Sequence, residues 1–292
     1  MLPARESAYA DQRNSDRMTW KIGVCSWSLD RHDPLRAIEL AAEINLRTIQ
    51  LGLFTEECMR QADFRAIRAA AAAADVVVHS TFAAFEREDY SSIASIAATG
   101  GFRCDTEYAH RLEMTRLAAD LTQRLGCRAL AVHVGTIPID QPCSDYQKLL
   151  GRTGEVAAML ADRKLELWIE SGREPADVLI AFIQKLALPN VRINFDPGNF
   201  VVYGTGEPPQ LVAPMMPMIG GVHMKDGVKS ARPGVEFGKP AVLGAGDAQI
   251  PRVISKLRAL GFAGPLFLEM SGREDQRSAL RSAAAYLHTL LA

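Results

Sequence analysis

Short apolar runs alternate with helical stretches along the chain from Lys21 onward. Eight of these runs have the composition of buried strands, with few polar residues inside them. They are Lys21–Ser26, Thr48–Leu51, Val76–Ser80, Ala129–His133, Glu166–Glu170, Val191–Asp196, Ile219–His223 and Leu266–Glu269. Strands that are apolar on both faces are typical of a parallel sheet that helices cover on each side.

Helical patterns follow these runs. They are Pro34–Ile44, Phe64–Ala74, His110–Leu125, Tyr146–Asp162, Pro175–Leu186, Pro209–Met218, Pro251–Leu260 and Asp275–Leu291. Several open with proline, which fits the first turn of a helix because an N–H group has no partner there. Parallel strands need long crossovers, which these helices supply. The count of eight favours a closed barrel over a doubly wound open sheet, so the predicted fold class is α/β, a single (β/α)8 TIM barrel.

The chain contains no linker rich in Pro, Gly or Ser that would separate two domains. Residues 1–18 are polar and aperiodic and lack the apolar region of a secretory signal, so we interpret them as a flexible N-terminal extension. Residues 19–292 then form one barrel domain. Two long connections, Thr81–Ala109 and Asp226–Ile250, have the length of functional loops at a barrel rim.

Composition and charge exclude several classes of protein. The chain has 292 residues, with 33 Lys and Arg against 34 Asp and Glu and a formal net charge of -1. This balance gives little general attraction to phosphates, so no nucleic-acid partner is expected. No apolar run approaches the roughly 18 residues of a membrane span, so no membrane partner is expected either. The five cysteines are scattered without a C-x-x-C pair, which predicts reduced thiols in a cytoplasmic protein.

Polar side chains stand at or next to the carboxyl end of six of the eight predicted strands. They are His79, His133, Glu170, Asp196, His223 and Glu269. The carboxyl ends of barrel strands converge on one face, where barrel active sites lie. Buried carboxylates and imidazoles are costly unless they are paired, hydrogen-bonded or bound to a metal. The pattern therefore predicts a bound cation at this face.

Each of these residues also has a purely structural interpretation. A single histidine at a strand end is often a rim residue, Asp196-Pro197-Gly198 is a common turn, and Glu170 and Glu269 stand close to Ser-Gly pairs that they could cap. These interpretations explain the joint occurrence poorly. Carboxylates with imidazole suit a divalent ion of octahedral preference. We expect Mn²⁺, with Mg²⁺, Co²⁺ and Zn²⁺ as alternatives.

Four motifs resemble the sugar phosphate isomerase/epimerase family of the xylose isomerase-like TIM barrel superfamily. They are W-I-E at Glu170, F-D-P-G-N at Asp196, V-H-M-K-D at His223 and L-F-L-E at Glu269. The opening K-I-G-V-C-S-W-S and the stretch L-G-A-G-D are similar to that family too, so the resemblance runs from about Lys21 to the C-terminus. It implies a divalent metal held by Glu170, Asp196, His223 and Glu269, with Glu170 and Glu269 also moving protons on opposite faces of the substrate.

Substrate contacts are expected from six further residues. They are His79, His133, Asn199, Lys225, Trp27 and Phe54. Lys225 shares a strand face with His223 and could bind a substrate hydroxyl or form an ion pair. Trp27 and Phe54 could form an apolar floor for a sugar ring or pack the loops. The chain departs from the family at Asn199, where many members have His, and at Lys229, where some have Arg.

The resemblance implies a metal-dependent isomerase or epimerase of a keto sugar or related polyol that acts through an enediolate. A lyase on the same scaffold, such as an inosose or dehydroshikimate dehydratase or an enzyme that eliminates an aglycone from an oxidised glycoside, begins with the same proton abstraction and stays an alternative. A non-catalytic sugar-binding barrel is disfavoured because all four ligand positions are present.

An apurinic-endonuclease relative would need a trinuclear zinc cluster with further ligands. His79 and His133 match two such positions, but Asn199 replaces a third and the loop after His223 has no other histidine. We therefore expect one metal per chain and a small sugar or polyol as the partner, with a homo-oligomer left open.

Overall fold

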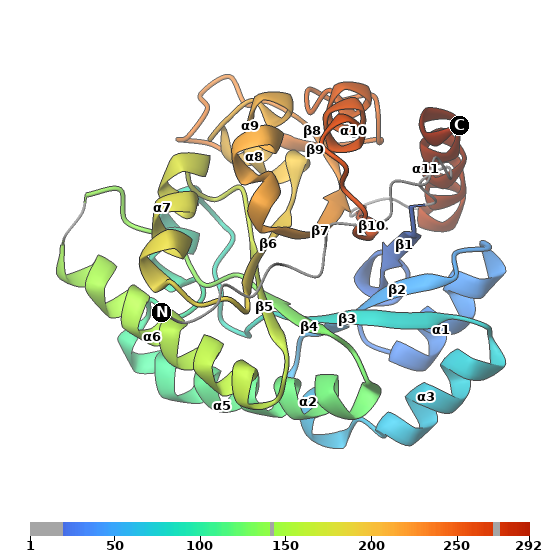
Figure 1. Cartoon of the computed structure of the whole chain (residues 1–292), viewed down its shortest axis with the longest axis horizontal. Helices are drawn as coiled ribbons and strands as arrows, with labels where there is room; N and C mark the ends of the chain where they lie inside the picture. Colours follow the sequence, from blue (N-terminus) through green and yellow to red (C-terminus); the bar gives the residue numbers. More distant parts are fainter. Residues whose placement is uncertain (1–19, 141–142, 271–274) are drawn as a thin grey trace, which may run out of the picture.

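Figure 1 shows the computed structural model, a closed barrel of parallel strands surrounded by helices. It describes residues 20–140, 143–270 and 275–292, so the expected extension at residues 1–18 lies outside the described residues. The strand order around the barrel is β1-β10-β7-β6-β5-β4-β3-β2, and each neighbouring pair is parallel. The predicted (β/α)8 barrel is confirmed.

The barrel strands are short, and most of their residues are buried. They are β1 (Ile22–Cys25), β2 (Thr48–Leu53), β3 (Val77–Ala83), β4 (Ala129–Val132), β5 (Glu166–Glu170), β6 (Val191–Phe195), β7 (Ile219–Met224) and β10 (Leu266–Leu268). Each overlaps one of the predicted apolar runs. Burial on both faces explains why these segments carry so few polar residues.

Helices cover the outside of the barrel at each expected position. They are α1 (Pro34–Glu43), α3 (Phe64–Ala73), α5 (Asp105–Leu125), α6 (Ser144–Asp162), α7 (Ala176–Leu186), α9 (Pro208–Met215), α10 (Ile250–Ala259) and α11 (Gln276–Leu291). Two 3-10 turns accompany them, η1 (Ser26–Ser28) after β1 and η2 (Met216–Met218) before β7. None of the helices in the described part of the chain combines the length and apolarity of a membrane span.

Three short helices were not predicted. They are α2 (Glu56–Gln61), α4 (Ile93–Thr99) and α8 (Pro197–Tyr203). All three lie in connections that leave the carboxyl end of a strand. The side chains of Thr55, Ser92 and Asp196 accept hydrogen bonds from their first turns, which is the usual stabilisation of a helix start.

The long connection after β7 is ordered around one buried carboxylate. It contains the antiparallel pair β8 (Asp226–Val228) and β9 (Lys239–Ala241). The carboxylate of Asp226 accepts hydrogen bonds from the backbone N–H groups of Gly244, Gly246 and Ala248, at 2.9 to 3.1 Å. The motifs V-H-M-K-D and L-G-A-G-D, distant in the sequence, are therefore joined directly. All five cysteines are free thiols, as predicted.

Candidate metal centre at the barrel mouth

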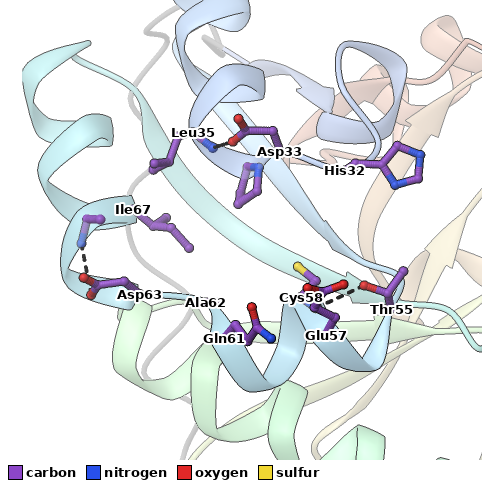
Figure 2. Close-up of a pocket in the computed structure, with 12 residues that line it drawn as sticks. His32, Asp33, Leu35, Thr55, Glu57, Cys58, Gln61, Ala62, Asp63 and Ile67 are labelled. Atoms are coloured by element: carbon purple, nitrogen blue, oxygen red, sulfur yellow. Dashed lines mark hydrogen bonds between the residues drawn. The ribbon is translucent and has the colours of Figure 1, made fainter.

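A cavity of about 410 Å³ opens beside the first turns of α1, α2 and α3 (Figure 2). Asp33, Thr55 and Asp63 line it, but each already accepts hydrogen bonds from the backbone at the start of one of these helices. None of the residues predicted to bind metal or substrate lies in its wall. The polar groups that the strand ends were expected to bring together are found elsewhere.

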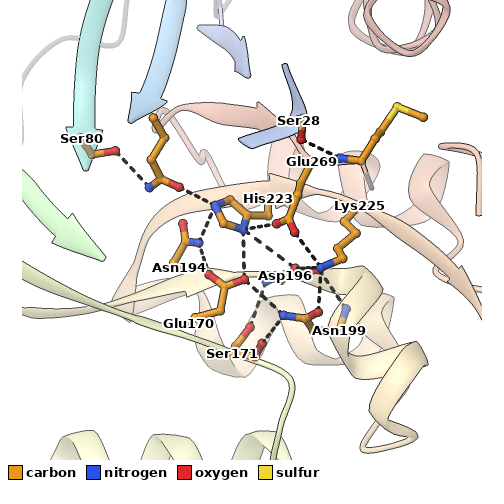
Figure 3. A network of polar contacts seen from close by, with 12 residues as sticks. Ser28, Ser80, Glu170, Ser171, Asn194, Asp196, Asn199, His223, Lys225 and Glu269 are labelled. Atoms are coloured by element: carbon orange, nitrogen blue, oxygen red, sulfur yellow. Dashed lines mark hydrogen bonds and ion pairs between the residues drawn. The ribbon is translucent and has the colours of Figure 1, made fainter. Parts of the chain in front are cut away.

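The four predicted ligands meet at the carboxyl end of the barrel (Figure 3). Glu170 is the last residue of β5 and His223 lies near the end of β7, while Asp196 and Glu269 directly follow β6 and β10. One ligand atom from each lies within 4.8 Å of those from the others. The pairing of parallel strands places these residues at one level of the barrel wall.

The two ring nitrogens of His223 face different partners. Nδ1 lies 3.0 Å from Glu170 Oε1 and 2.8 Å from Glu269 Oε2. Nε2 lies 2.6 Å from the side-chain oxygen of Gln50, whose amide nitrogen donates to Ser80 Oγ at 3.1 Å. Burial would lower the pKa of His223, but Cys25 and Glu170 raise it well above its usual range, so without a cation Nδ1 carries a proton toward the carboxylates. A cation bound here would displace that proton, and Nδ1 would then offer its lone pair while Nε2 donates to Gln50. This is the arrangement of a metal-binding histidine held by an outer hydrogen bond.

Asp196 is fully buried and uses only one of its oxygens within the protein. Oδ1 accepts the backbone N–H of Asn199 at 2.9 Å and so caps α8. Oδ2 has no hydrogen-bond partner among the described residues; its nearest cation is Lys225 Nζ at 3.6 Å. Burial raises the pKa of Asp196 well above its usual range, although the charge of Lys225 opposes this. A buried carboxylate oxygen without a donor is the open position that a cation would fill.

Glu170 and Glu269 lie in different environments. Glu170 is 2% exposed at its side chain and accepts hydrogen bonds from the amides of Asn194 and Asn199. Glu269 is 11% exposed and accepts from Lys225 Nζ at 2.8 Å. Burial alone would raise the pKa of Glu269, but the charges and hydrogen bonds of Lys225 and His223 outweigh it and hold this pKa below its usual range. Carboxylates in unlike environments can serve as different proton carriers.

The charge of the cluster fits a divalent ion. Burial would lower the pKa of Lys225, but the carboxylates of Glu269 and Asp196 raise it well above its usual range, so the ammonium group stays charged. Metal ligation requires a neutral imidazole and ionised carboxyl groups, and in that state three carboxylates and one ammonium would leave two negative charges in a buried site. A divalent cation would balance them, and the three oxygen donors with one nitrogen donor suit Mn²⁺ or Mg²⁺.

Aromatic rings stand beside this cluster. The ring centroid of Trp27, in η1, lies 5.3 Å from that of Phe54, 5.1 Å from Phe82 and 5.6 Å from His223. The two predicted aromatic residues therefore contact each other next to the metal cluster. Phe82 was not predicted to take part, because the apolar run of its strand was expected to end before it.

Three other predicted substrate residues also lie at this face. His133 follows β4, is partly exposed and packs 5.8 Å from the ring of Phe82. Asn199 Nδ2 donates to Glu170 Oε1 at 3.2 Å, and its oxygen accepts from Lys225 Nζ at 3.1 Å. Lys229, by contrast, pairs with Glu207 away from these groups. His133, Asn199 and Lys225 therefore lie beside the four predicted metal ligands, as expected for substrate contacts.

His79 lies at the opposite end of the barrel. It is the third residue of β3, which continues to Ala83. Its ring packs 5.9 Å from Trp168 and 5.7 Å from Phe267, and it lines a cavity of about 480 Å³ together with Lys21 and Arg128, which precede β1 and β4. The expectation that His79 ends its strand beside the metal centre is therefore wrong.

The cause of this error lies in the two residues after His79. The predicted strand ended at Ser80, and Thr81 was assigned to the connection that follows, yet both residues are fully buried in the barrel wall. Ser80 accepts from Gln50, and the hydroxyl of Thr81 lies 2.6 Å from that of Thr122 in α5. Each hydroxyl has a local partner, so the strand continues through them.

Sequence reasoning also missed residues that hold the centre. Gln50 and Asn194 lie inside predicted strands. A polar residue within an otherwise apolar strand was the signal that could have identified them as site residues. Cys25, at the end of β1, offers a sulfur within 4.8 Å of ligand atoms of His223 and Glu269. Burial raises the pKa of this thiol to about 12, so it is neutral at ordinary pH.

Comparison with protein families and solved structures agrees with this geometry. Residues 38–290 match the family model described as xylose isomerase-like TIM barrel. A xylose isomerase domain protein from Planctomyces limnophilus is 30% identical with a TM-score of 0.87, and the match covers 93% of this chain and 97% of that chain. No curated protein matches the sequence significantly.

Two more distant structures share the fold. A xylose isomerase-like TIM barrel protein from Mycobacterium smegmatis, in complex with magnesium, is 16% identical with a TM-score of 0.71, covering 94% of this chain and 97% of that one. D-allulose 3-epimerase from Methylomonas sp., in complex with D-allulose, is 14% identical with a TM-score of 0.70, covering 94% and 99%.

Proposed function

The chain belongs to the family of xylose isomerase-like TIM barrels, and from this membership we propose that it is a divalent-metal-dependent isomerase or epimerase of a keto sugar or related polyol. One observation carries the proposal. Three carboxylates and Nδ1 of His223 converge at the barrel mouth, and Oδ2 of Asp196 has no hydrogen-bond partner among the described residues. The fold shared with a sugar epimerase and with a magnesium-bound barrel supports it.

Glu170, Asp196, His223 and Glu269 would hold the metal, with Mn²⁺ expected and Mg²⁺, Co²⁺ or Zn²⁺ as alternatives. A divalent cation bound there polarises a carbonyl and offsets the negative charge that develops on its oxygen. Gln50 fixes the imidazole of His223, and Asn194 and Asn199 fix the carboxylate of Glu170. These contacts hold the ligand atoms in place before substrate binds.

Glu170 and Glu269 are proposed to move the proton. In an isomerase or epimerase, a base removes the proton next to the carbonyl and an acid returns it to a carbon of the resulting enediolate. The amides of Asn194 and Asn199 contact Glu170, whereas the ammonium of Lys225 contacts Glu269, so the two carboxylates lie in different environments. Such a pair can divide the tasks of base and acid.

The substrate would lie against residues on the same face. Lys225 and Asn199 offer a positive charge and an amide to hydroxyl or carbonyl oxygens, and His133 adds an imidazole. Trp27, Phe54 and Phe82 offer apolar rings to the carbon face of a sugar. A lyase would use the same first step and differ only in the group that leaves, so the products decide between the two.

The direct test is the exchange of a substrate α-proton with solvent. Keto sugars, inososes and 3-oxo-glycosides are incubated with the Mn²⁺-loaded protein in D₂O, and deuterium uptake is read by mass spectrometry. We expect exchange for at least one class, its loss on chelation, and its recovery on adding Mn²⁺. Glu269→Gln should lower the rate by about 10²- to 10⁴-fold, while Glu39→Gln, at an exposed position in α1, should leave it unchanged.

Several results would contradict the proposal. Exchange that survives chelation, or an undiminished rate in both Glu269→Gln and Glu170→Gln, would remove the metal or the glutamates from the reaction. A dehydrated or eliminated product would assign the lyase. Metal-dependent cleavage of an abasic-site duplex would assign an endonuclease instead.

A further inference from the structure

Arg173 is a buried guanidinium group without an acidic partner among the described residues. It follows Glu170 by three positions, in the connection between β5 and α7, and is only 5% exposed. Its Nη2 donates to the hydroxyl of Tyr90 at 2.6 Å. Nε and Nη1 are buried and have no hydrogen-bond partner in the described part of the chain. Arginine stays charged at any ordinary pH, so a positive charge with unused donors is buried here.

No acidic group forms an ion pair with Arg173 in the described part of the chain. Burial would lower the pKa of Arg173, but Tyr90, Tyr203, Glu88 and Glu174 raise it above its usual range, so the guanidinium stays charged. Burial raises the pKa of the adjacent Glu174 to about 8, which leaves that carboxyl group largely protonated at neutral pH. Burial also raises the pKa of Tyr90 and Tyr203, so both phenols stay neutral. The carboxylate of Glu88 accepts from the Tyr90 hydroxyl and from the backbone N–H of Gly101 and forms no hydrogen bond with Arg173 itself.

A second buried arginine shows what a structural role looks like in this region. Arg111, in α5, donates from Nη1 to the backbone carbonyl oxygens of Thr99 and Gly101, at 2.6 and 2.5 Å, and so anchors the turn between α4 and α5. Arg173 binds no backbone carbonyl in this way. Its one hydrogen bond goes to Tyr90, which is 50% exposed. Both arginines leave two side-chain nitrogens without a partner among the described residues, Nε and Nη2 in Arg111 and Nε and Nη1 in Arg173. They differ in that only Arg111 is bound to the backbone.

Arg173 lies on the same face of the barrel as the metal centre. It belongs to the connection that begins at Glu170, and its guanidinium lies 5.4 Å from the ring of Tyr90, in the connection after β3. A Cβ atom at Gly100 would lie 2.7 Å from its Nη1. Burial lowers the pKa of His133, and the charge of Arg173 lowers it further. Arg173 therefore stands at the rim, near His133 and the loops that follow β3 and β5.

We propose that Arg173 binds an anionic group of the substrate, a carboxylate or a phosphate, at a distance from the carbon that reacts. The inference rests on the proposed function for the other end of the substrate, which the metal centre would hold. An anion would supply the acceptors that Nε and Nη1 lack and would balance the buried charge. Tyr90, half exposed and bonded to the guanidinium, stands where such a group would enter.

Binding measurements on three related sugars test this inference. D-fructose, D-fructose 6-phosphate and D-fructuronate are titrated by calorimetry into the Mn²⁺-loaded protein, so that a neutral sugar, a phosphate and a carboxylate are compared. We expect at least one anion to bind about 10- to 100-fold more tightly than fructose. Which anion gains distinguishes phosphate from carboxylate.

Two variants show whether a preference for the anionic sugar comes from Arg173 or from another group. Arg173→Gln should remove the preference for the anion, whereas Arg87→Gln, which removes an equal charge from a 70% exposed side chain in the same rim connection, should retain it. An anion that binds the metal directly would keep its advantage in both variants. The proposal is overturned if Arg173→Gln retains the preference, or if neither anion binds more tightly than fructose, including the case where none binds.

Thermal stability distinguishes a ligand-binding arginine from a structural one. A buried charge whose partner is a ligand does not stabilise the folded protein when that ligand is absent. Arg173→Met should therefore not lower Tm in anion-free buffer. A clear drop in Tm would assign Arg173 to the fold instead. Because these readouts need no turnover, they stand apart from α-proton exchange: exchange without an anion preference would refute only this inference.

Discussion

At the scale of single residues, the hydrogen bonds of each side chain determine whether it can bind a metal at the barrel mouth. Nδ1 of His223 faces the carboxylates of Glu170 and Glu269, while Nε2 lies 2.6 Å from the side-chain oxygen of Gln50 and 2.9 Å from the amide nitrogen of Asn194. Ser80 in turn holds the amide of Gln50. The outer contact fixes the orientation and tautomer of the imidazole, and thus the direction of its lone pair.

Replacing Gln50 should therefore weaken metal binding without removing a ligand. We expect Gln50→Leu to raise the dissociation constant for Mn²⁺ by about 10- to 100-fold, the usual effect of losing an outer-shell partner. Titration of the metal-free variant measures this. Gln123→Leu, at an exposed position in α5, serves as the control and should bind Mn²⁺ like the wild type. Equal affinities in both variants would show that Gln50 does not orient the ligand.

Glu174 predicts a pH dependence of stability. Burial raises its pKa from 4.5 to about 8. Between these values the folded protein keeps a proton that the unfolded chain releases, so the free energy of unfolding falls as pH rises, by about 1.4 kcal/mol per pH unit. Below pH 4.5 both states are protonated and the effect vanishes.

Glu174→Gln keeps a neutral side chain at every pH and should lose this slope. Urea unfolding at pH 5 and pH 7 measures it. Other titrating groups act equally on both proteins, so the variant should gain on the wild type by about 3 kcal/mol between these two pH values. Parallel stability curves would mean that Glu174 is ionised in the folded protein.

At the scale of single elements, β3 and α8 show where local patterns mislead. The predicted strand ended at Ser80, but the hydroxyls of Ser80 and Thr81 both have partners inside the barrel and β3 continues to Ala83. Asp196-Pro197-Gly198 is also a common turn, yet it begins α8, because Asp196 caps the first turn and Pro197 fits its first position. The continuation of β3 depends on Gln50 and Thr122, which are distant in the sequence, whereas the start of α8 rests on local signals that also fit a turn.

The position of His79 gives a prediction about β3. Since His79 lies at the amino end of the barrel, against Trp168 and Phe267, it cannot reach a substrate at the mouth. We expect His79→Leu to leave the rate of α-proton exchange unchanged, and His133→Leu to change it or the KM. A loss of exchange in His79→Leu with an unchanged Tm would contradict this placement.

At the scale of the whole molecule, the barrel itself makes the site. The alternation of apolar runs and helices was enough to predict eight parallel strands, and their carboxyl ends brought Glu170, Asp196, His223 and Glu269 to one face. The surroundings of the site were not predictable in this way. The contact of Gln50 with His223 joins residues 173 positions apart, and the barrel closes between β1 and β10. Only the closed structure shows that these side chains meet.

The central claim is that these four side chains form one divalent-metal site, and equilibrium dialysis against Mn²⁺ tests it most directly. We predict one ion per chain for the wild type, loss of tight binding in Asp196→Asn, and unchanged binding in Asp177→Asn, which removes an equal charge from an exposed position at the start of α7. Wild-type binding in Asp196→Asn, or no tightly bound ion in the wild type, would contradict the account.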